Sequence, residues 1–420
     1  MDTYKAGKRS SISFGSYQRP VVSFNQNELP YYAPRQLYSA QQSAQQPDVV
    51  YPCRYEAHFP LYAMDWSNED YVAVGSYKED TFNKLQILHS SDLVSWEKAG
   101  EENCVFPISR VQWCPNGNSQ QLATCSDSLR LWDYSDFVLQ ERLNLSFCRY
   151  NKSGGQGTVA ALGQLPPVSS FHWNAVDPNL IISSSIDTTC TVWDLQATNY
   201  VKTQLIAHDS EVFDVKFLTQ STQLFASCGG DGSVRVFDLR SLAHSTIIYE
   251  PSSQPTAGSS GDSSAASGGS GSGSNSASSG SNALLRLEPS PFDPNVVATF
   301  AHDSNSVLIL DMRYPGAAIL TLEGHVGAVN QIQWHPSRHN VLLTCGDDCQ
   351  ALLWDLNTHL STPASNTVSS KWNSSKVARC IDTPQEAYSD ANYEINNIVW
   401  RPQGNWFGCN LGRHFQSVRV

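Results

Sequence analysis

From about residue 49 to the C-terminus, short apolar runs alternate with turn residues in a pattern that repeats. One unit, residues 207–240, contains His208 in its first loop, apolar runs at 212–217, 224–228 and 234–237, an Asp-Gly turn, and a closing Asp238. Apolar runs of four to six residues bounded by Gly, Asp and Ser are typical of β-strands joined by tight turns. The pattern therefore predicts an all-β chain built from one recurring unit.

The repeat can be counted from an apolar anchor at the end of one strand to the Asp that closes the unit. This interval is 20, 21, 21, 22 and 21 residues in five units: Trp113 to Asp133, Trp173 to Asp194, Phe217 to Asp238, Pro289 to Asp311, and Trp334 to Asp355. An Asp also precedes the last strand of each, at 127, 187, 231, 303 and 348. Two further units, at 61–88 and 394–420, lack the closing pair but keep the strand pattern, so we predict seven units.

The closing residues carry a family resemblance. The dipeptide Trp-Asp stands at 132–133, 193–194 and 354–355, and is altered to Phe237-Asp238 and Leu310-Asp311. This pattern resembles the WD40 family, whose repeats end in Trp-Asp and form four-stranded propeller blades. The resemblance implies a seven-bladed WD40 β-propeller.

The two ends of the chain predict how such a ring would close. The sequence stops at FQSVRV, the third strand of the last unit, so that blade needs an outer strand from elsewhere. The segment around residues 54–57 lies just before the first unit. We expect it to supply the missing strand and pair the two ends of the propeller.

Three segments do not fit the repeat. Residues 1–47 are rich in Gln, Ser, Tyr and Pro without periodicity, which predicts a disordered arm before a propeller at 48–420. Residues 251–283 are almost entirely Ser, Gly, Ala and Asn and predict a flexible insertion. Residues 357–391 form a second, polar insertion with Trp372 as its one large anchor.

The composition limits which partners the chain can bind and in which cell compartment we expect it. A net charge of −12 is the wrong sign for sequence-independent binding of nucleic acid or anionic lipid, so we expect neither. We find no signal peptide and no run of about 18 apolar residues, and eleven scattered cysteines suit reduced thiols, so we expect a cytoplasmic and nuclear monomer. The basic residues Lys5, Lys8, Arg9 and Arg19 fit either an import signal or a solvated tail.

Ser227, His208 and Asp231 are the residue types of a nucleophilic triad. The same set recurs as Thr344, His325 and Asp348 with identical spacings, whereas a catalytic site is needed once. We therefore interpret both sets as hydrogen-bond networks that tie a loop to a turn. In the WD40 family the indole N–H of the Trp completes this network, which implies such a role for Trp354 but not for Phe237.

Other units have no His at the matching place, where Cys104, Gln164 and Ser276 stand, so their loops must be held differently.

A second constellation, His335, His339, Cys345 and Cys349, has the ligand types of a zinc site. The repeat places these four on different parts of a blade, and their side chains should diverge. We expect no metal and no cofactor.

Longer phrases point to a closer resemblance. RYEAHFPLYAMDW at 54–66, FHWNAVDPNLIISSSIDTTCTVWDL at 171–195 and GGDGSVRVFDLRSLAHSTIIYE at 229–250 are similar to the plant Transparent Testa Glabra and anthocyanin-regulator WD40 proteins. They are equally similar to the animal counterpart, a cullin-ligase-associated scaffold that binds DYRK-type kinases. The resemblance implies a non-enzymatic scaffold that bridges kinases or transcription regulators with their clients.

A substrate receptor of a cullin-RING ubiquitin ligase is the alternative function. In such receptors a Trp-Asp-x-Arg box contacts the ligase adaptor, and this chain matches its Asp and Arg at Asp238, Arg240, Asp311 and Arg313. Each Arg could equally pair with its acidic neighbours. An enzyme is the third reading, disfavoured because every polar constellation that suits catalysis is repeated.

Overall fold

The computed structural model describes residues 35–36, 54–117, 119–150, 166–251, 283–360 and 379–420. The chain divides into two compact units, Met1–Ala33 and Pro34–Val420, and all the described residues belong to the second. The predicted arm and the predicted Ser/Gly insertion therefore lie outside the described residues, apart from Arg35–Gln36 and the insertion's end positions 251 and 283.

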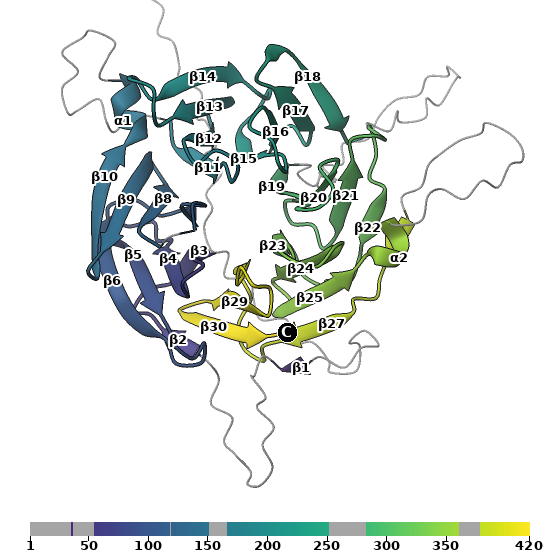
Figure 1. The fold of residues 1–420 in the computed structure, drawn as a ribbon. Helices are drawn as coiled ribbons and strands as arrows, with labels where there is room; N and C mark the ends of the chain where they lie inside the picture. The colour runs from purple at the N-terminus through teal and green to yellow at the C-terminus, as the bar shows by residue number, and fades with distance from the viewer. Residues whose placement is uncertain (1–34, 37–53, 118, 151–165, 252–282, 361–378) are drawn as a thin grey trace, which may run out of the picture. The chain divides into compact units, whose positions relative to one another are not determined.

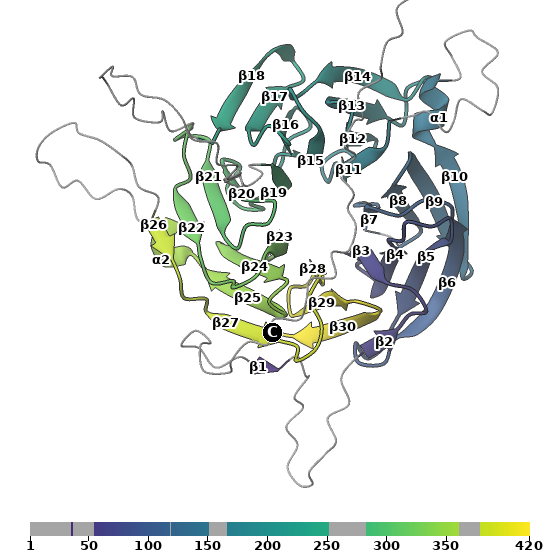
Figure 2. The ribbon, with the colours of Figure 1, turned by 180° about the vertical axis from the view of Figure 1, so that it is seen from behind.

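Seven β-sheets surround a common centre, and Figures 1 and 2 show them from opposite ends. Blade 1 consists of β3 (Leu61–Trp66), β4 (Tyr71–Ser76), β5 (Asn83–His89) and β6 (Glu97–Cys104). Blade 2 consists of β7 (Arg110–Trp113), β8 (Gln121–Cys125), β9 (Leu129–Ser135) and β10 (Val138–Asn144), followed by the helix α1 (Leu145–Tyr150). Blade 3 consists of β11 (Val168–Trp173), β12 (Leu180–Ser185), β13 (Thr189–Asp194) and β14 (Val201–Ile206).

The remaining blades follow the same antiparallel order. Blade 4 consists of β15 (Val212–Phe217), β16 (Leu224–Gly229), β17 (Val234–Asp238) and β18 (Ser241–Tyr249). Blade 5 consists of β19 (Leu284–Pro289), β20 (Val296–Ala301), β21 (Val307–Asp311) and β22 (Leu320–Leu322). Blade 6 contains β23 (Val329–Trp334), β24 (Val341–Gly346) and β25 (Gln350–Asp355), and blade 7 contains β28 (Asn397–Trp400), β29 (Trp406–Leu411) and β30 (His414–Arg419). The predicted seven-bladed propeller is thereby confirmed.

Burial explains why the strands of one blade differ in sequence. The second strand is covered on both faces by neighbouring blades, and β24 and β29 are buried at all six positions, as their nearly continuous apolar sequences require. The outer strand β14 alternates between half-buried and exposed positions. The hydrophobic core lies between blades, as in the cluster that joins Leu85 and Ile87 of blade 1 to Trp113 and Trp132 of blade 2.

The ring closes through the N-terminal strand, as predicted. The segment β2 (Arg54–Glu56) pairs antiparallel with β30, with Arg54 opposite Gln416 and Glu56 opposite His414. This pairing makes β2 the outer strand of blade 7 and joins the two ends of the propeller.

The polar insertion 357–391 contains strands that its sequence does not reveal. After the helix α2 (Asn357–Leu360), β26 (Arg379–Ile381) adds parallel to β22, and β27 (Glu386–Ser389) forms the fourth strand of blade 6. The strand β1 (Arg35–Gln36) adds parallel to the outside of β27. Trp372, the expected anchor, lies outside the described residues.

Candidate functional site

The triad-like residues of blade 4 meet at one end of the blade. The ring of His208 lies with Nδ1 2.9 Å from Asp231 Oδ2 and Nε2 2.7 Å from Ser227 Oγ. Burial alone would raise the pKa of Asp231, but hydrogen bonds from His208 and from the backbone N–H of Ser233 hold that pKa below its ordinary value. Ser227 has no exposed surface, so its hydroxyl is closed to a substrate.

Blade 6 repeats this geometry. His325 Nδ1 lies 2.9 Å from Asp348 Oδ2, and its Nε2 lies 2.7 Å from Thr344 Oγ1. Trp354 donates its indole N–H to the same hydroxyl at 3.0 Å. Thr344 also has no exposed surface. The structure thus brings together all seven residues of the two sequence-derived sets, in two separate blades.

Blades 2 and 3 keep the Trp–hydroxyl part of this arrangement. Trp132 donates to Thr124 at 2.8 Å, and Trp193 donates to Ser183 at 2.9 Å. In blade 2, which has no His in the matching loop, Asp127 forms a salt bridge of 2.7 Å with Arg130 of its own third strand, as Asp231 does with Arg235 in blade 4. Cys104 ends β6, while Gln164 and Ser276 lie outside the described residues.

The four residues of the candidate ligase-adaptor box form two local Asp–Arg pairs. The guanidinium of Arg240 donates to Asp238 at 2.6 Å, and these hydrogen bonds lower the pKa of Asp238 to about 2. Arg313 donates to Asp311 at 2.7 Å and to Asp293 at 2.9 Å, which raises the pKa of the Arg313 guanidinium. Both Arg side chains are more than half exposed, so each pair presents a planar cation to solvent.

The residues of the candidate zinc constellation have separate environments. His335 Nε2 lies 2.9 Å from the carbonyl of Gly404, and its Nδ1 accepts the backbone N–H of Arg338. Cys345 is buried in the core between blades 6 and 7, and the ring of His339 stacks on Phe292. Among the described residues, no group of three or more His, Cys, Asp or Glu side chains has a geometry that could hold a metal ion.

Sequence reasoning missed a set of contacts between blades near the centre of the ring. The side chain just before one anchor accepts the backbone N–H of the next anchor: Asp65 from Trp113 at 2.7 Å, Gln112 from Trp173 at 2.8 Å, His172 from Phe217 at 3.1 Å, and Gln333 from Trp400 at 2.6 Å. These bonds satisfy donors on the innermost strands, which have no neighbouring strand on that side. A polar residue stands before six of the seven anchors, all but Trp400, and this is the signal that could have revealed them.

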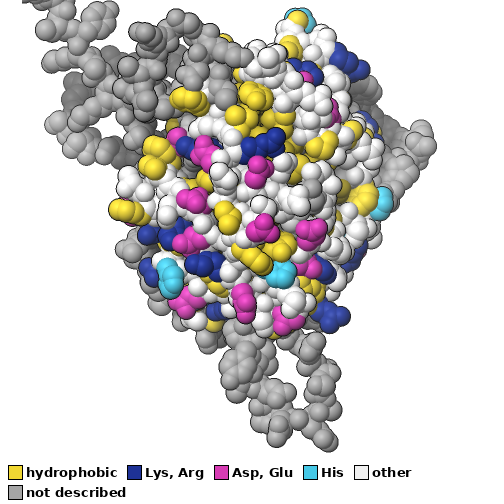
Figure 3. Space-filling model, turned by 60° about the vertical axis from the view of Figure 1, so that its left-hand side comes forward, with side chains coloured by type: hydrophobic (Ala, Val, Ile, Leu, Met, Phe, Trp, Pro, Cys, Tyr) yellow, Lys and Arg dark blue, Asp and Glu magenta, His cyan; other side chains and the backbone are white. Residues whose placement is uncertain are grey.

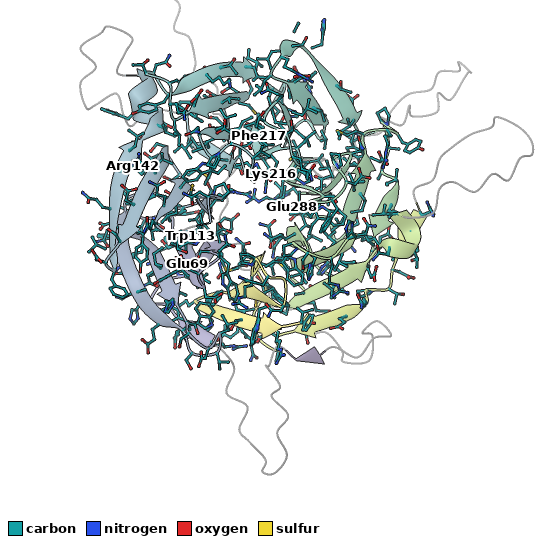
Figure 4. All side chains as sticks on the ribbon, in the orientation of Figure 1. Glu69, Trp113, Arg142, Lys216, Phe217 and Glu288 are labelled. Atoms are coloured by element: carbon teal, nitrogen blue, oxygen red, sulfur yellow. The ribbon has the colours of Figure 1, made fainter. Side chains whose placement is uncertain are left out.

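Charged side chains continue this set between blades 4 and 5. Lys216 Nζ lies 2.8 Å from Glu288, and Figure 4 shows the two side chains meeting near the centre of the ring. The buried Asp214 accepts from Ser170 at 2.6 Å and from the backbone N–H of Leu287 at 2.9 Å. Burial would raise the pKa of Asp214, but the nearby cations, Arg110 foremost, lower it below the ordinary value.

No helix among the described residues is long and apolar enough to cross a membrane.

Comparison with known proteins agrees with this architecture. The profile of the WD40 family, described as WD domain, G-beta repeat, matches residues 199–238 and 316–355, the two segments that contain the complete His networks. The chain is 51% identical to a WD repeat-containing protein of Saccharomyces cerevisiae, over 100% of this chain and 86% of that protein. It is 36% identical to the DDB1- and CUL4-associated factor 7 homolog of Dictyostelium discoideum, over 87% of this chain and 98% of that protein. With full-length relatives at this identity and the seven-bladed propeller, the chain belongs to the WD40 repeat family.

Proposed function

We propose that the chain is a non-enzymatic scaffold that holds regulatory proteins, such as DYRK-type kinases or transcription regulators, close to their clients in the cytoplasm and nucleus. The observation that carries this proposal is the burial of the repeated His–hydroxyl–Asp sets. Because Ser227 and Thr344 are fully buried, these sets serve as architecture, and the surfaces left for function are the loops and strand edges.

A rigid ring suits this role physically. Blades tied to one another by buried apolar clusters and by hydrogen bonds between inner strands keep their loops at fixed separations. Two partners bound to different blades then have a high effective concentration for each other without chemistry by the scaffold.

Association with a cullin-RING ligase is the second candidate. The name of the Dictyostelium relative, DDB1- and CUL4-associated factor 7 homolog, and the two exposed Asp–Arg pairs favour it. In this role the propeller presents bound clients to the ligase, and the guanidinium groups of Arg240 and Arg313 contact the adaptor.

Affinity purification of the full chain from cells, with identification of the bound proteins, tests both roles. A scaffold should copurify a kinase or transcription regulator together with a client. Purification of the chain with no reproducible partner would contradict the scaffold proposal.

The ligase role has its own variants. Asp238→Ala combined with Arg240→Ala should abolish copurification of the adaptor while the kinase or regulator stays bound. A matched control, Asp127→Ala with Arg130→Ala, removes a salt bridge of the same kind from the opposite end of a blade and should leave adaptor binding intact. Adaptor binding that survives the first pair of substitutions would remove the ligase proposal.

A further inference from the structure

Three large apolar side chains are exposed on blade 1 where β5 begins and β6 ends. Phe82 is 77% exposed, Val105 57% and Phe106 44%. Asn83 at the start of β5 pairs with Cys104 at the end of β6, so Phe82 and Val105 leave the sheet next to each other. We call Phe82, Val105 and Phe106 the blade 1 apolar cluster. A grouped set of this kind is less common on a protein surface than single exposed apolar residues.

The loop that carries Phe82 is held rigidly. The buried side chain of Asn83 accepts hydrogen bonds from Ser76 Oγ at 2.8 Å and from Lys78 N at 2.9 Å, and donates to the carbonyl of Asp80 at 2.9 Å. The backbone N–H of Phe82 donates to Asp80 Oδ1 at 2.9 Å. An aromatic side chain on a backbone fixed in this way loses little entropy on binding.

The second loop of the cluster is fixed as well. Ile108 is buried, and its backbone N–H donates to the carbonyl of Ser76 at 3.0 Å. Its side chain packs so closely on Gly75 that a Cβ added there would lie 2.9 Å from Ile108 Cβ. Val105 and Phe106 therefore stand on a loop anchored to the same blade as Phe82.

Blade 1 differs from the other blades at this end. Six residues separate β4 from β5, whereas two to five separate the second and third strands of the other six blades. Blades 4 and 6 use the corresponding loop to hold the Asp of a His network, whereas the blade 1 loop exposes an aromatic side chain. The longer loop of blade 1 therefore places an aromatic side chain on the surface, which is typical of loops that bind partners.

Acidic side chains outnumber basic ones around the cluster, and the two acidic residues in the Phe82 loop itself are exposed. Glu79 and Asp80 lie exposed in the Phe82 loop, and Glu101 and Glu102 lie on β6, against Lys78, Lys84 and Lys98. Lys84 forms a salt bridge with Glu101. Figure 3, which brings the blade 1 and blade 2 side of the ring forward, shows hydrophobic side chains interspersed with acidic and basic ones. The potential next to the cluster favours a cationic partner.

We propose that the blade 1 apolar cluster docks a segment of a partner protein that carries apolar side chains flanked by Lys or Arg. The proposal rests on the scaffold function and specifies one surface that serves it. Phe82 acts as the central anchor, Val105 and Phe106 complete the apolar floor, and Glu79 and Asp80 face the basic flanks.

The first experiment places a photoreactive p-benzoylphenylalanine at position 82 of the full chain in cells and identifies the cross-linked segment by mass spectrometry. The same group at Phe137 is the matched control, because Phe137 is 70% exposed in the turn between β9 and β10, at the opposite end of a blade. We expect position 82 alone to capture an apolar segment with basic flanks. Capture of an acidic segment, of residues 1–34 of this chain, or of a second copy would overturn the proposal.

The second experiment measures affinity with the captured segment made as a synthetic peptide. Phe82→Ala should weaken its binding to the full chain at least tenfold, and Asp80→Lys severalfold, while Phe137→Ala changes nothing. Unchanged melting temperatures would show that the variants remain folded. If the full chain retains copurified partners but Phe82→Ala binds the peptide normally, this surface is wrong and the scaffold function stands. If no partner copurifies at all, the scaffold proposal itself fails.

Discussion

Blades 4 and 6 contain the same buried network but complete it with different residues. Every member of the network in blade 4 has its counterpart 117 positions later in blade 6, from His208 and His325 onward. In blade 6, Trp354 donates a hydrogen bond to the Thr344 hydroxyl in addition to the one between that hydroxyl and His325. In blade 4, Phe237 has no donor and instead stacks on Phe225 with the ring centres 5.0 Å apart.

Blade 4 strengthens the Asp end of its network instead. Ser233 donates its hydroxyl to Asp231 at 2.8 Å, and Arg235 donates to the same carboxylate at 3.1 Å. Blade 6 has Gln350 and Leu352 at these positions, and Gln350 Oε1 is buried with no hydrogen-bond partner among the described residues. Blade 6 thus gains one side-chain hydrogen bond at the hydroxyl, and blade 4 gains two at the carboxylate.

The residue before each His also differs between the two blades, in step with the exchange of Trp354 for Phe237. A Cβ added to Gly324 would lie 2.7 Å from Cη2 of Trp354, so the indole fills the space of a methyl group. Blade 4 has Ala207 at this place, opposite the smaller ring of Phe237. Gly with Trp and Ala with Phe are therefore matched pairs, which shows that a repeat tolerates change when neighbours change together.

Loss of the His should have the largest effect. His208→Leu and His325→Leu each leave a buried hydroxyl and a carboxylate without their main partner, so the free energy of unfolding should fall by about 3 kcal/mol. Because Thr344 keeps the hydrogen bond from Trp354, we expect a loss smaller by about 1 kcal/mol in blade 6. Urea denaturation of the full chain measures both, with the exposed His244→Leu as control. Equal losses would mean that the Trp does not compensate.

A larger side chain at Gly324 should have the second-largest effect on stability. Gly324→Ala forces the indole of Trp354 out of place and should cost about 2 kcal/mol, as overpacked cores do. Trp354→Phe should recover most of that cost when combined with it, because the pair then matches blade 4. A double-mutant cycle on melting temperature and urea midpoint checks the coupling.

The reciprocal pair in blade 4 controls for this result. Phe237→Trp should destabilise the chain alone, and less so together with Ala207→Gly. Strictly additive effects in both blades would refute the matching of the two positions.

Removal of the cation in blade 4 should have the smallest effect. Arg235→Leu reproduces the residue of blade 6 and should cost about 1 kcal/mol at pH 7, since the salt bridge is only partly buried. The pKa of Asp231 is below its ordinary 3.8 in the folded chain, so its stabilisation is present above pH 3.8 and is lost as the pH falls. The difference in melting temperature between wild type and variant should therefore stay constant from pH 7 to about pH 4 and shrink only as the pH falls below 3.8. A constant difference would show that Arg235 acts through packing alone.

Much of the fold could be predicted from particular residues. The interval of 20 to 22 residues from anchor to Asp identified five blades, the strand pattern at 61–88 and 394–420 added two, and the final FQSVRV predicted the pairing of β2 with β30. Strand β27 could not be found, because only four residues, EAYS, form it and they follow a long polar stretch. Its pairing with β25 depends on a partner far away in the sequence, which local patterns do not contain.

For the candidate site, too, some features could be predicted from the sequence and others could not. The identical spacings of His, Ser or Thr, and Asp were sufficient to place two networks in two blades, because a repeated sequence folds into a repeated geometry. Whether Arg240 and Arg313 pair locally stayed open until the structure showed their carboxylate partners.

By itself, the sequence determined the repeat: the number of blades, the order of the three inner strands in a unit, and the His, Ser or Thr, and Asp of two networks. These features depend on spacing within one unit. Only the tertiary structure decided the contacts between units, such as Asp65 with Trp113 across two blades, and the loop conformations within a unit, such as those that place Phe82 next to Val105. Such contacts depend on the closure of the ring and on the conformation of irregular loops. The physical reason is that these contacts form between segments that come together only when the whole chain has folded. The periodicity of apolar residues, by contrast, contains information only about the strand in which it occurs.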